Sequence, residues 1–168
     1  DQQSSKLLPA TNDKQFVHLR KEEQIIRNYL LFEKAFQRDK FKYRINIKGD
    51  IENTEISPFI LFPVVRSAVL YRRDRIAGLQ ELNIFFECIN DLLIMRIEKI
   101  IYSENDLIPD YEWKDELNLA RKKLDLIYPW TFSLDVKETE QKLYIELNIR
   151  LRNNPENNNH ENSLYDRR

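Results

Sequence analysis

The sequence predicts an α+β fold, a two-layer α/β sandwich in which helices cover a mostly antiparallel sheet. Two observations carry this prediction. Segments in which apolar and polar residues alternate come in pairs with short turns between them, which is typical of antiparallel hairpins. Single segments with helical spacing of apolar residues stand between the strands. With 168 residues, 42% of them hydrophobic, the chain is long enough for one domain with a buried core.

Two helices and one strand are predicted in the first half of the chain. Residues 22–37 form an amphipathic helix, whose apolar side carries Ile25, Ile26, Tyr29, Leu30, Phe32 and Phe36. Residues 41–47 alternate apolar with basic or polar side chains, as in a strand with one buried face. Ser57 resembles an N-cap and Pro58 a first helical residue, so residues 58–72 are expected to form a buried helix. Pro63 should bend this helix or delay its true start.

The second half contains two hairpins on either side of a helix. The predicted elements are a strand at 82–88, a turn at Asn90-Asp91, a strand at 93–97, a loop at 103–109, a helix at 112–127, a strand at 132–136, a turn at 138–141 and a strand at 143–149. Together with the first half, this gives the order α-β-α-β-β-α-β-β.

The two ends of the chain differ in composition from the centre. Residues 1–15 are polar and are expected to form a flexible lead-in. Residues 152–168 are rich in Asn and poor in apolar residues, which predicts a disordered tail. The domain is therefore expected to span 16–151. Because the chain begins at Asp1, we expect it to be a piece of a longer protein.

Composition excludes several kinds of functional site. The chain has 2 glycines, Gly49 and Gly78, far apart, where average usage would give about 12. A P-loop or GxGxxG turn needs clustered glycines that let backbone N–H groups approach a phosphate, so neither is present. One cysteine excludes an internal disulfide and a cysteine-based zinc cluster. The net charge of −1 gives no general attraction to nucleic acid.

Three segments, in order, resemble the C-terminal region of LytS/YehU-like sensor histidine kinases. The first is Phe16 to Leu19 followed by Glu22, Glu23, Ile26, Tyr29, Leu30 and Glu33, which is similar to the family's "FVPL…EL…I.NYL.lEk" segment. The second, residues 56–65, looks like "IPPFLLQPLVENAIKHG". The third carries Leu117, Arg121, Lys123, Leu124, Leu126, Ile127 and Tyr128, similar to "GIGLxNVRxRLxLLY". The resemblance implies a Bergerat-type ATPase fold, with residues 20–37 as the linker helix from the phosphoacceptor region.

At the family's ATP-binding positions the side chains differ. The Asn and Glu of the magnesium-binding box fall at Arg66 and Ser67. Arginine neither ligates a metal nor accepts a proton. The Asp that binds the adenine amino group falls at Lys99, within about one residue, and lysine offers no acceptor. The family's Gly that lets the adenine approach falls at Ile101, the third-box glycines at Lys114 and Glu116, and the third-box Asn at Leu119.

The resemblance places the phosphoacceptor histidine upstream of this chain. His18 matches the family's "VPL" proline, and His160 lies in the predicted tail, so neither is expected to carry phosphate. Catalytic residues and metal ligands are therefore not assigned.

Some residues allow both a functional and a structural interpretation, and we favour the structural one. Arg72, Arg73 and Arg75 could bind phosphate, but a solvated helix end is expected. Arg66 is expected to fill the pocket as a cation paired with a carboxylate. Cys88 is expected to be a packed core thiol. The aromatic residues Trp113, Tyr128 and Trp130 are expected to be core anchors. The acidic residues Glu22, Glu23, Asp115 and Glu116 are expected to be surface charges.

These observations lead to a functional hypothesis with two alternatives. We expect an ATPase-like domain of a sensor histidine kinase that no longer binds ATP and signals through contact with a sister subunit, a kinase or a response regulator. A homodimer, cytoplasmic placement and a membrane anchor outside this chain are also expected. The first alternative is an active but divergent kinase domain that binds Mg-ATP. The second is a nucleic-acid-binding module that uses Arg72, Arg73, Arg75 and residues 121–123, which the net charge disfavours.

Overall fold

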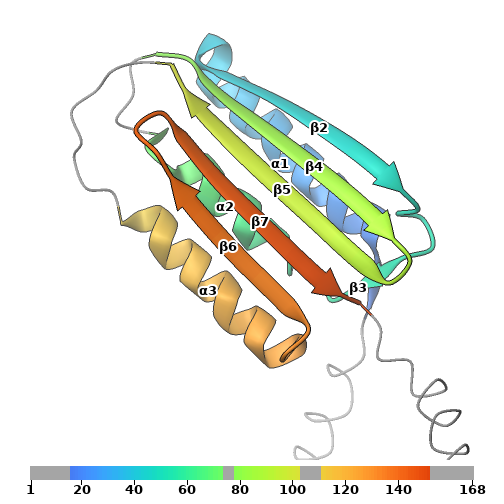
Figure 1. Cartoon of the computed structure of the whole chain (residues 1–168). Helices are drawn as coiled ribbons and strands as arrows, with labels where there is room; N and C mark the ends of the chain where they lie inside the picture. The colour runs from blue at the N-terminus through green and yellow to red at the C-terminus, as the bar shows by residue number, and fades with distance from the viewer. Residues whose placement is uncertain (1–15, 74–77, 103–110, 152–168) are drawn as a thin grey trace, which may run out of the picture.

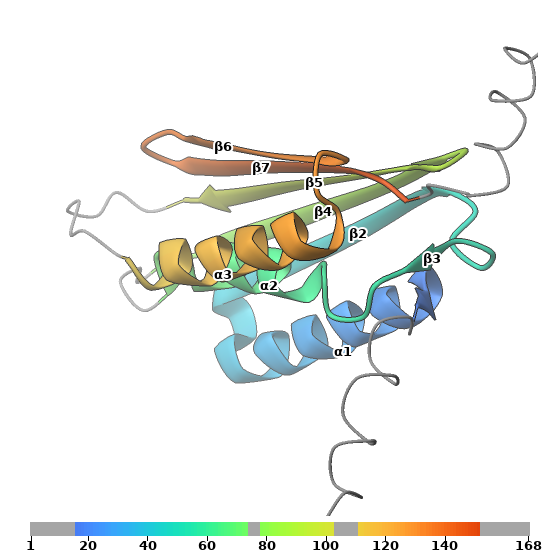
Figure 2. The same ribbon diagram turned by 90° about the horizontal axis from the view of Figure 1, so that it is seen from below.

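The domain is a two-layer α+β sandwich, which confirms the predicted fold class. The computed structural model describes residues 16–73, 78–102 and 111–151. A five-stranded sheet forms one layer, and the helices pack on one of its faces (Figures 1 and 2). The predicted lead-in, the predicted tail and the predicted loop at 103–109 lie outside the described residues.

The main sheet has the strand order β2-β4-β5-β7-β6. Its strands are β2 (Phe41–Gly49), β4 (Gln80–Ile89), β5 (Leu92–Ile101), β6 (Phe132–Glu138) and β7 (Lys142–Arg150). The two predicted hairpins, β4–β5 and β6–β7, are confirmed as antiparallel pairs. The sequence pattern assigns no partner to the strand at 41–47, and the structure shows that this strand, β2, lies parallel to β4. The chain between β2 and β4 contains a helix, and such a crossover brings the next strand back in the same direction.

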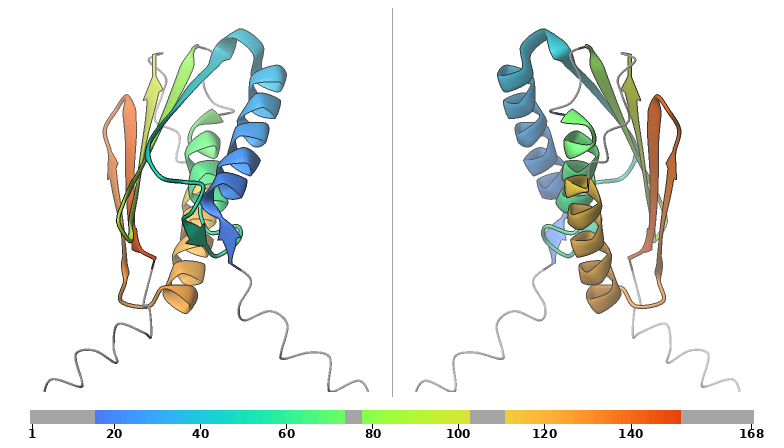
Figure 3. Two further views of the ribbon diagram at one scale, coloured as in Figure 1. Left: turned by 90° about the vertical axis from the view of Figure 1, so that its right-hand side faces the viewer. Right: turned by 90° about the vertical axis from the view of Figure 1, so that its left-hand side faces the viewer.

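Three helices cover the sheet. They are α1 (Leu19–Gln37), α2 (Phe62–Leu70) and α3 (Glu112–Ile127), and the 3₁₀ helix η1 (Arg38–Lys40) follows α1. A small antiparallel sheet, which the sequence did not predict, joins β1 (Val17–His18) to β3 (Glu55–Ile56). Two residues are too few to show an alternating pattern. Figure 3 shows the two layers edge-on, with both described ends of the chain at the same end of the domain.

The second helix begins later than Ser57 and Pro58 predicted. Its first residue is Phe62, so Pro63 lies in the first turn and delays the helix start without bending it. Ser57 does not cap the helix; its backbone N–H donates a hydrogen bond to the Tyr128 hydroxyl at 2.9 Å. The residues between are fixed by long-range contacts of this kind, which a local capping pattern cannot reveal.

The core lies between the inner face of the sheet and the helices. Alternate residues of β4, β5 and β7 are buried, as their periodicity predicted. Most residues of α2 are buried as well, because α1 and α3 flank it (Figure 2). Each buried Val, Leu or Ile contributes about 1.5–3 kcal/mol. Within the described residues, no helix has the length and apolar character needed to cross a membrane.

Candidate functional site

The four positions that the family resemblance assigns to the ATP site lie on three elements. Arg66 and Ser67 are on α2, Lys99 is on β5 and Leu119 is on α3. Ser67 and Lys99 are buried, whereas Arg66 and Leu119 are exposed, and none of the four lines either of the two cavities described below.

The two α2 side chains make contacts within the fold. The Ser67 hydroxyl is buried and donates to the Val64 carbonyl oxygen at 2.6 Å, within its own helix. The Arg66 guanidinium lies 3.5 Å from the Glu116 carboxylate and so links α2 to α3. The carboxylate partner expected for Arg66 is thus present, but the side chain is 45% exposed and does not fill an enclosed pocket.

Lys99 is the most unusual residue of this group, because its side chain is 0% exposed. Its ammonium group donates hydrogen bonds to the carbonyl oxygens of Val69 and Tyr71, at 2.8 and 2.5 Å. These carbonyls belong to the C-terminal end of α2, where the helix dipole favours a cation. The Tyr71 ring also lies beneath the ammonium group, with its centroid 6.0 Å away. Lys99 therefore caps α2 from inside the core and presents donors only.

The first turns of α3 pack against the same end of α2. The buried Trp113 ring meets Tyr71 edge-on, with centroids 5.1 Å apart. Lys114 is exposed and lies over the aromatic rings beside it, and Leu119 points away from the core. The Tyr71 and Trp113 rings therefore pack against each other where the end of α2 meets the start of α3.

The cationic residues after α2 are also held by the fold. The Arg72 guanidinium donates to the Glu140 carbonyl oxygen at 2.8 Å, and the Arg73 guanidinium lies 3.0 Å from the Glu33 carboxylate on α1. The expectation of a solvated helix end is therefore wrong for both, because each bridges to another element. Arg75 lies outside the described residues. These contacts also count against the nucleic-acid alternative, since this pair of guanidinium groups is directed at the protein.

Two expectations about α1 are wrong in opposite directions. Glu22 and Glu23 are buried, not surface charges, and Phe32 and Phe36 are exposed, not part of the buried side. Glu22 accepts hydrogen bonds from the backbone N–H groups of Phe59 and Leu61 at 3.1 and 3.2 Å. It thereby fixes the segment that leads into α2.

The aromatic expectations are partly confirmed. Trp113 and Tyr128 are buried core residues, as expected. Trp130 is fully exposed and is not a core anchor, because it follows α3 in a turn with a positive φ of 67°.

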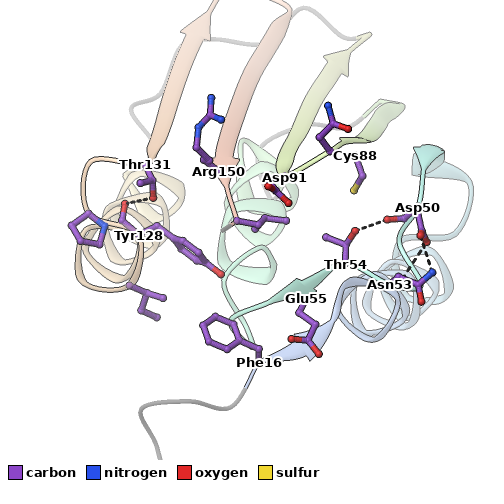
Figure 4. Close-up of a pocket in the computed structure, with 14 residues that line it drawn as sticks. Phe16, Asp50, Asn53, Thr54, Glu55, Cys88, Asp91, Tyr128, Thr131 and Arg150 are labelled. Atoms are coloured by element: carbon purple, nitrogen blue, oxygen red, sulfur yellow. Dashed lines mark hydrogen bonds between the residues drawn. The ribbon is translucent and has the colours of Figure 1, made fainter. Parts of the chain in front are cut away.

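A cavity lies at the other end of β5 from Lys99 (Figure 4). It has a volume of about 1020 Å³ and is bounded by the loop after β2, the β4–β5 turn, the end of α3 and the end of β7. The carboxylates of Asp50, Glu55 and Asp91 and the guanidinium-bearing Arg150 are among its lining residues. Hydrogen bonds from the Asn53 side chain and backbone hold the pKa of Asp50 below its usual range. This acidic lining disfavours a nucleotide triphosphate, whose phosphates it would repel.

Cys88 lines the same cavity and packs against the core, as predicted for a structural thiol. Burial and the nearby charge of Asp50 raise the pKa of Cys88 to about 11. A thiol with such a pKa is almost entirely protonated near neutral pH and is a poor nucleophile. The sequence did not identify this cavity, because its lining comes from segments that are far apart along the chain.

The face of the sheet opposite the helices has a shallower groove of about 550 Å³. Phe85, Arg96, Tyr144 and Glu146 contribute to it. The Arg96 guanidinium lies 2.8 Å from the Glu146 carboxylate and 5.7 Å from the centroid of the Phe85 ring. The charges of Arg96 and Glu146 therefore neutralise each other.

Comparison with known proteins gives a structural likeness only. No family model matches the sequence, and no curated protein matches it. The nucleotide-free catalytic domain of histidine kinase ThkA is similar, with a TM-score of 0.59 and 11% identity over 82% of this chain and 99% of that chain.

Two further histidine kinases are similar over more of this chain. AdeS of Acinetobacter baumannii has a TM-score of 0.56 and 13% identity, over 89% of this chain and 72% of that chain. The histidine kinase domain of the blue-light-activated kinase EL346 of Erythrobacter litoralis has a TM-score of 0.54 and 10% identity, over 89% and 69%. A structure of ThkA in complex with the response regulator TrrA is also similar, with a TM-score of 0.53 and 13% identity, over 82% and 42%. At such low identity this likeness concerns the fold, and the chain has the fold of a histidine kinase catalytic domain.

Proposed function

We propose that this domain is the ATPase-like region of a LytS/YehU-type sensor histidine kinase that no longer binds ATP and signals through contact with another protein. The fold supports the kinase origin. The side chains at the positions of the three nucleotide boxes support the loss of ATP binding.

The observation that carries the proposal is the buried Lys99. The resemblance places the family's carboxylate, which accepts the adenine amino group, at Lys99 within about one residue. Lys99 has no acceptor, and its ammonium group is already bound to the Val69 and Tyr71 carbonyls. An adenine amino group is also a hydrogen-bond donor, so at this position it would meet a cation that offers it no acceptor.

The phosphate side of the site supports the same conclusion. Arg66 cannot ligate magnesium, and the Ser67 hydroxyl is directed at the Val64 carbonyl oxygen. Magnesium prefers carboxylate oxygens and water in a near-octahedral arrangement, which these two side chains do not provide. Mg-ATP therefore does not fit the residues at these positions, and we derive no phosphoryl-transfer step for the domain.

A protein partner fits this role. ThkA, whose catalytic domain has a similar fold, forms a complex with a response regulator, so this fold is compatible with contacts to signalling proteins. We propose such a contact for this domain, on the cytoplasmic side of a membrane protein whose anchor lies outside this chain.

Thermal unfolding with and without excess Mg-ATP tests the proposal. A ligand at about 100 times its Kd stabilises a protein by about 2.7 kcal/mol, which is roughly 5–10 °C for a domain of this size. We expect no shift at millimolar nucleotide, whereas an active histidine kinase catalytic domain measured in parallel should shift. A magnesium-dependent shift would favour the alternative, an active but divergent kinase domain.

A further inference from the structure

The outer face of α1 carries an apolar patch that no described residue covers. Leu31, Phe32, Ala35 and Phe36 are exposed on adjacent turns of the helix, and the two phenylalanine side chains are 67% and 74% exposed. Leu31 and Ala35, like Phe32 and Phe36, are four residues apart, and side chains at this spacing lie on the same face of a helix one turn apart. Neighbouring apolar side chains on one exposed helix face are a feature of interaction surfaces.

The charges on α1 are distributed unevenly between its two faces. Its three carboxylates, Glu22, Glu23 and Glu33, are all buried. Glu22 accepts backbone hydrogen bonds, Glu23 lies 2.6 Å from Arg27, and Glu33 lies 3.0 Å from Arg73. The solvent-facing charges of the helix are therefore cationic.

The cations extend to the end of the patch. Among the described residues, Arg38 and Lys40 of η1 form no ion pair, and the Lys34 ammonium donates to the carbonyl oxygens of Arg38 and Phe41. Asp39 is the acidic residue beside them. Residues 19–48 contain nine Lys or Arg and four Asp or Glu, a formal charge of +5, whereas the rest of the chain sums to −6. The patch thus lies in the basic part of an otherwise acidic chain.

These charges distinguish between candidate partners. A second copy would place Arg38 and Lys40 opposite the same cations, or near Arg27 in an antiparallel pairing, and like charges at an interface are unfavourable. An extended anionic bilayer would need a broad cationic surface, but Lys42 and Arg44 are exposed and alternate with the core-facing residues of β2, so they lie on the face of the sheet away from α1. An acidic protein surface complements the patch without these conflicts.

We infer that the α1–η1 patch, defined as Leu31, Phe32, Ala35, Phe36, Arg38 and Lys40, docks a protein partner whose surface has an apolar centre and an acidic rim. This inference rests on the proposed function, namely signalling by protein contact, and names the surface that makes it. Phe32 and Phe36 supply the anchors, and the η1 cations select the acidic partner.

Site-specific photo-crosslinking tests the inference in the full-length protein in its own cells. The photoreactive residue p-benzoylphenylalanine is placed at position 32 or, as a matched control, at position 126, where Leu126 is exposed on α3. We expect an adduct with an acidic protein at position 32 and a weaker one or none at position 126. Combined Arg38→Glu and Lys40→Glu changes should reduce the adduct at least fivefold, and reversal of the partner's contacting acidic residues to Lys should restore it.

Several outcomes would overturn the inference. Two of them concern the partner: an adduct between two copies of this chain, or binding of the domain to vesicles that contain 30 mol% phosphatidylglycerol. The other two concern the crosslink: a crosslinking yield at position 32 no greater than at position 126, or a yield at position 32 that the charge reversal leaves unchanged. Thermal shift with Mg-ATP on the charge-reversed variant separates the two proposals. A shift with nucleotide contradicts the loss of ATP binding, whereas failure of the crosslink without such a shift contradicts the docking surface alone.

Discussion

Replacement of Glu22 should destabilise the domain, because its carboxylate joins two segments that are distant in the chain. The side chain is fully buried and accepts hydrogen bonds from the backbone N–H groups of Phe59 and Leu61. These two donors lie in the segment before α2, whose turn includes a positive φ of 57° at Phe59. Without an acceptor, they would be left unsatisfied next to the core.

The size of the effect follows from the number of lost bonds. A buried donor left unsatisfied costs about 1–3 kcal/mol. Glu22→Ala removes both acceptors, so we expect a loss of about 2–5 kcal/mol in the free energy of unfolding. Glu22→Gln keeps the shape and one acceptor oxygen, so the loss should be about half as large.

Urea unfolding monitored by circular dichroism measures these losses, and the m-value should stay constant if the unfolded state is unchanged. Gln24→Ala on the exposed side of the same helix is the control and should change stability by less than about 0.5 kcal/mol. Hydrogen exchange should show faster exchange of the Phe59 and Leu61 amides in both Glu22 variants. A loss below about 1 kcal/mol for Glu22→Ala, or equal losses for both variants, would refute the reasoning.

Three further predictions concern other parts of the fold. Gly49→Ala should lower stability by about 2 kcal/mol or more, since φ is +95° there and the added Cβ would lie 2.1 Å from the carbonyl oxygen of Cys88; urea unfolding with a loss under 0.5 kcal/mol would contradict this. Burial raises the pKa of Tyr71 from 10.0 to about 12, so the unfolded chain releases this proton first and stability should fall as pH rises from 10 to 12. Tyr71→Phe should make this fall shallower, and an unchanged slope would count against it. Acrylamide should quench the fluorescence of the exposed Trp130 but hardly that of the buried Trp113, which Trp130→Phe and Trp113→Phe variants can separate; equal quenching would contradict the structure.

The first helix illustrates what the sequence could and could not predict. Its end at Gln37 followed from the spacing of apolar residues, but its start at Leu19 and its orientation did not. The buried side contains Leu19, Ile26 and Leu30 together with three glutamates, and the exposed side carries two phenylalanines. The helical spacing of 19, 22, 23, 26, 30 and 33 was a usable signal, but hydrophobicity alone assigned the carboxylates to solvent. Their burial depends on donors from distant segments, which the local sequence does not contain.

The candidate site shows a similar division. The motif resemblance predicts that Lys99 stands where the family has an acceptor, because that comparison needs only residue identities. The position of the Lys99 ammonium on the C-terminal carbonyls of α2 required the packing of β5 against that helix. The parallel pairing of β2 with β4 was also hidden, since the sequence pattern of a strand does not reveal its direction.

The central claim is that the positions of the nucleotide boxes no longer hold ATP, and an NMR titration of the isotope-labelled domain with Mg-ATP tests it most directly. We predict that the amide signals of Ser67 and Lys99 stay unchanged up to millimolar nucleotide, with and without magnesium. Saturable, magnesium-dependent shifts of these two amides, and of their neighbours on α2 and β5, would contradict the claim and assign ATP binding to this domain.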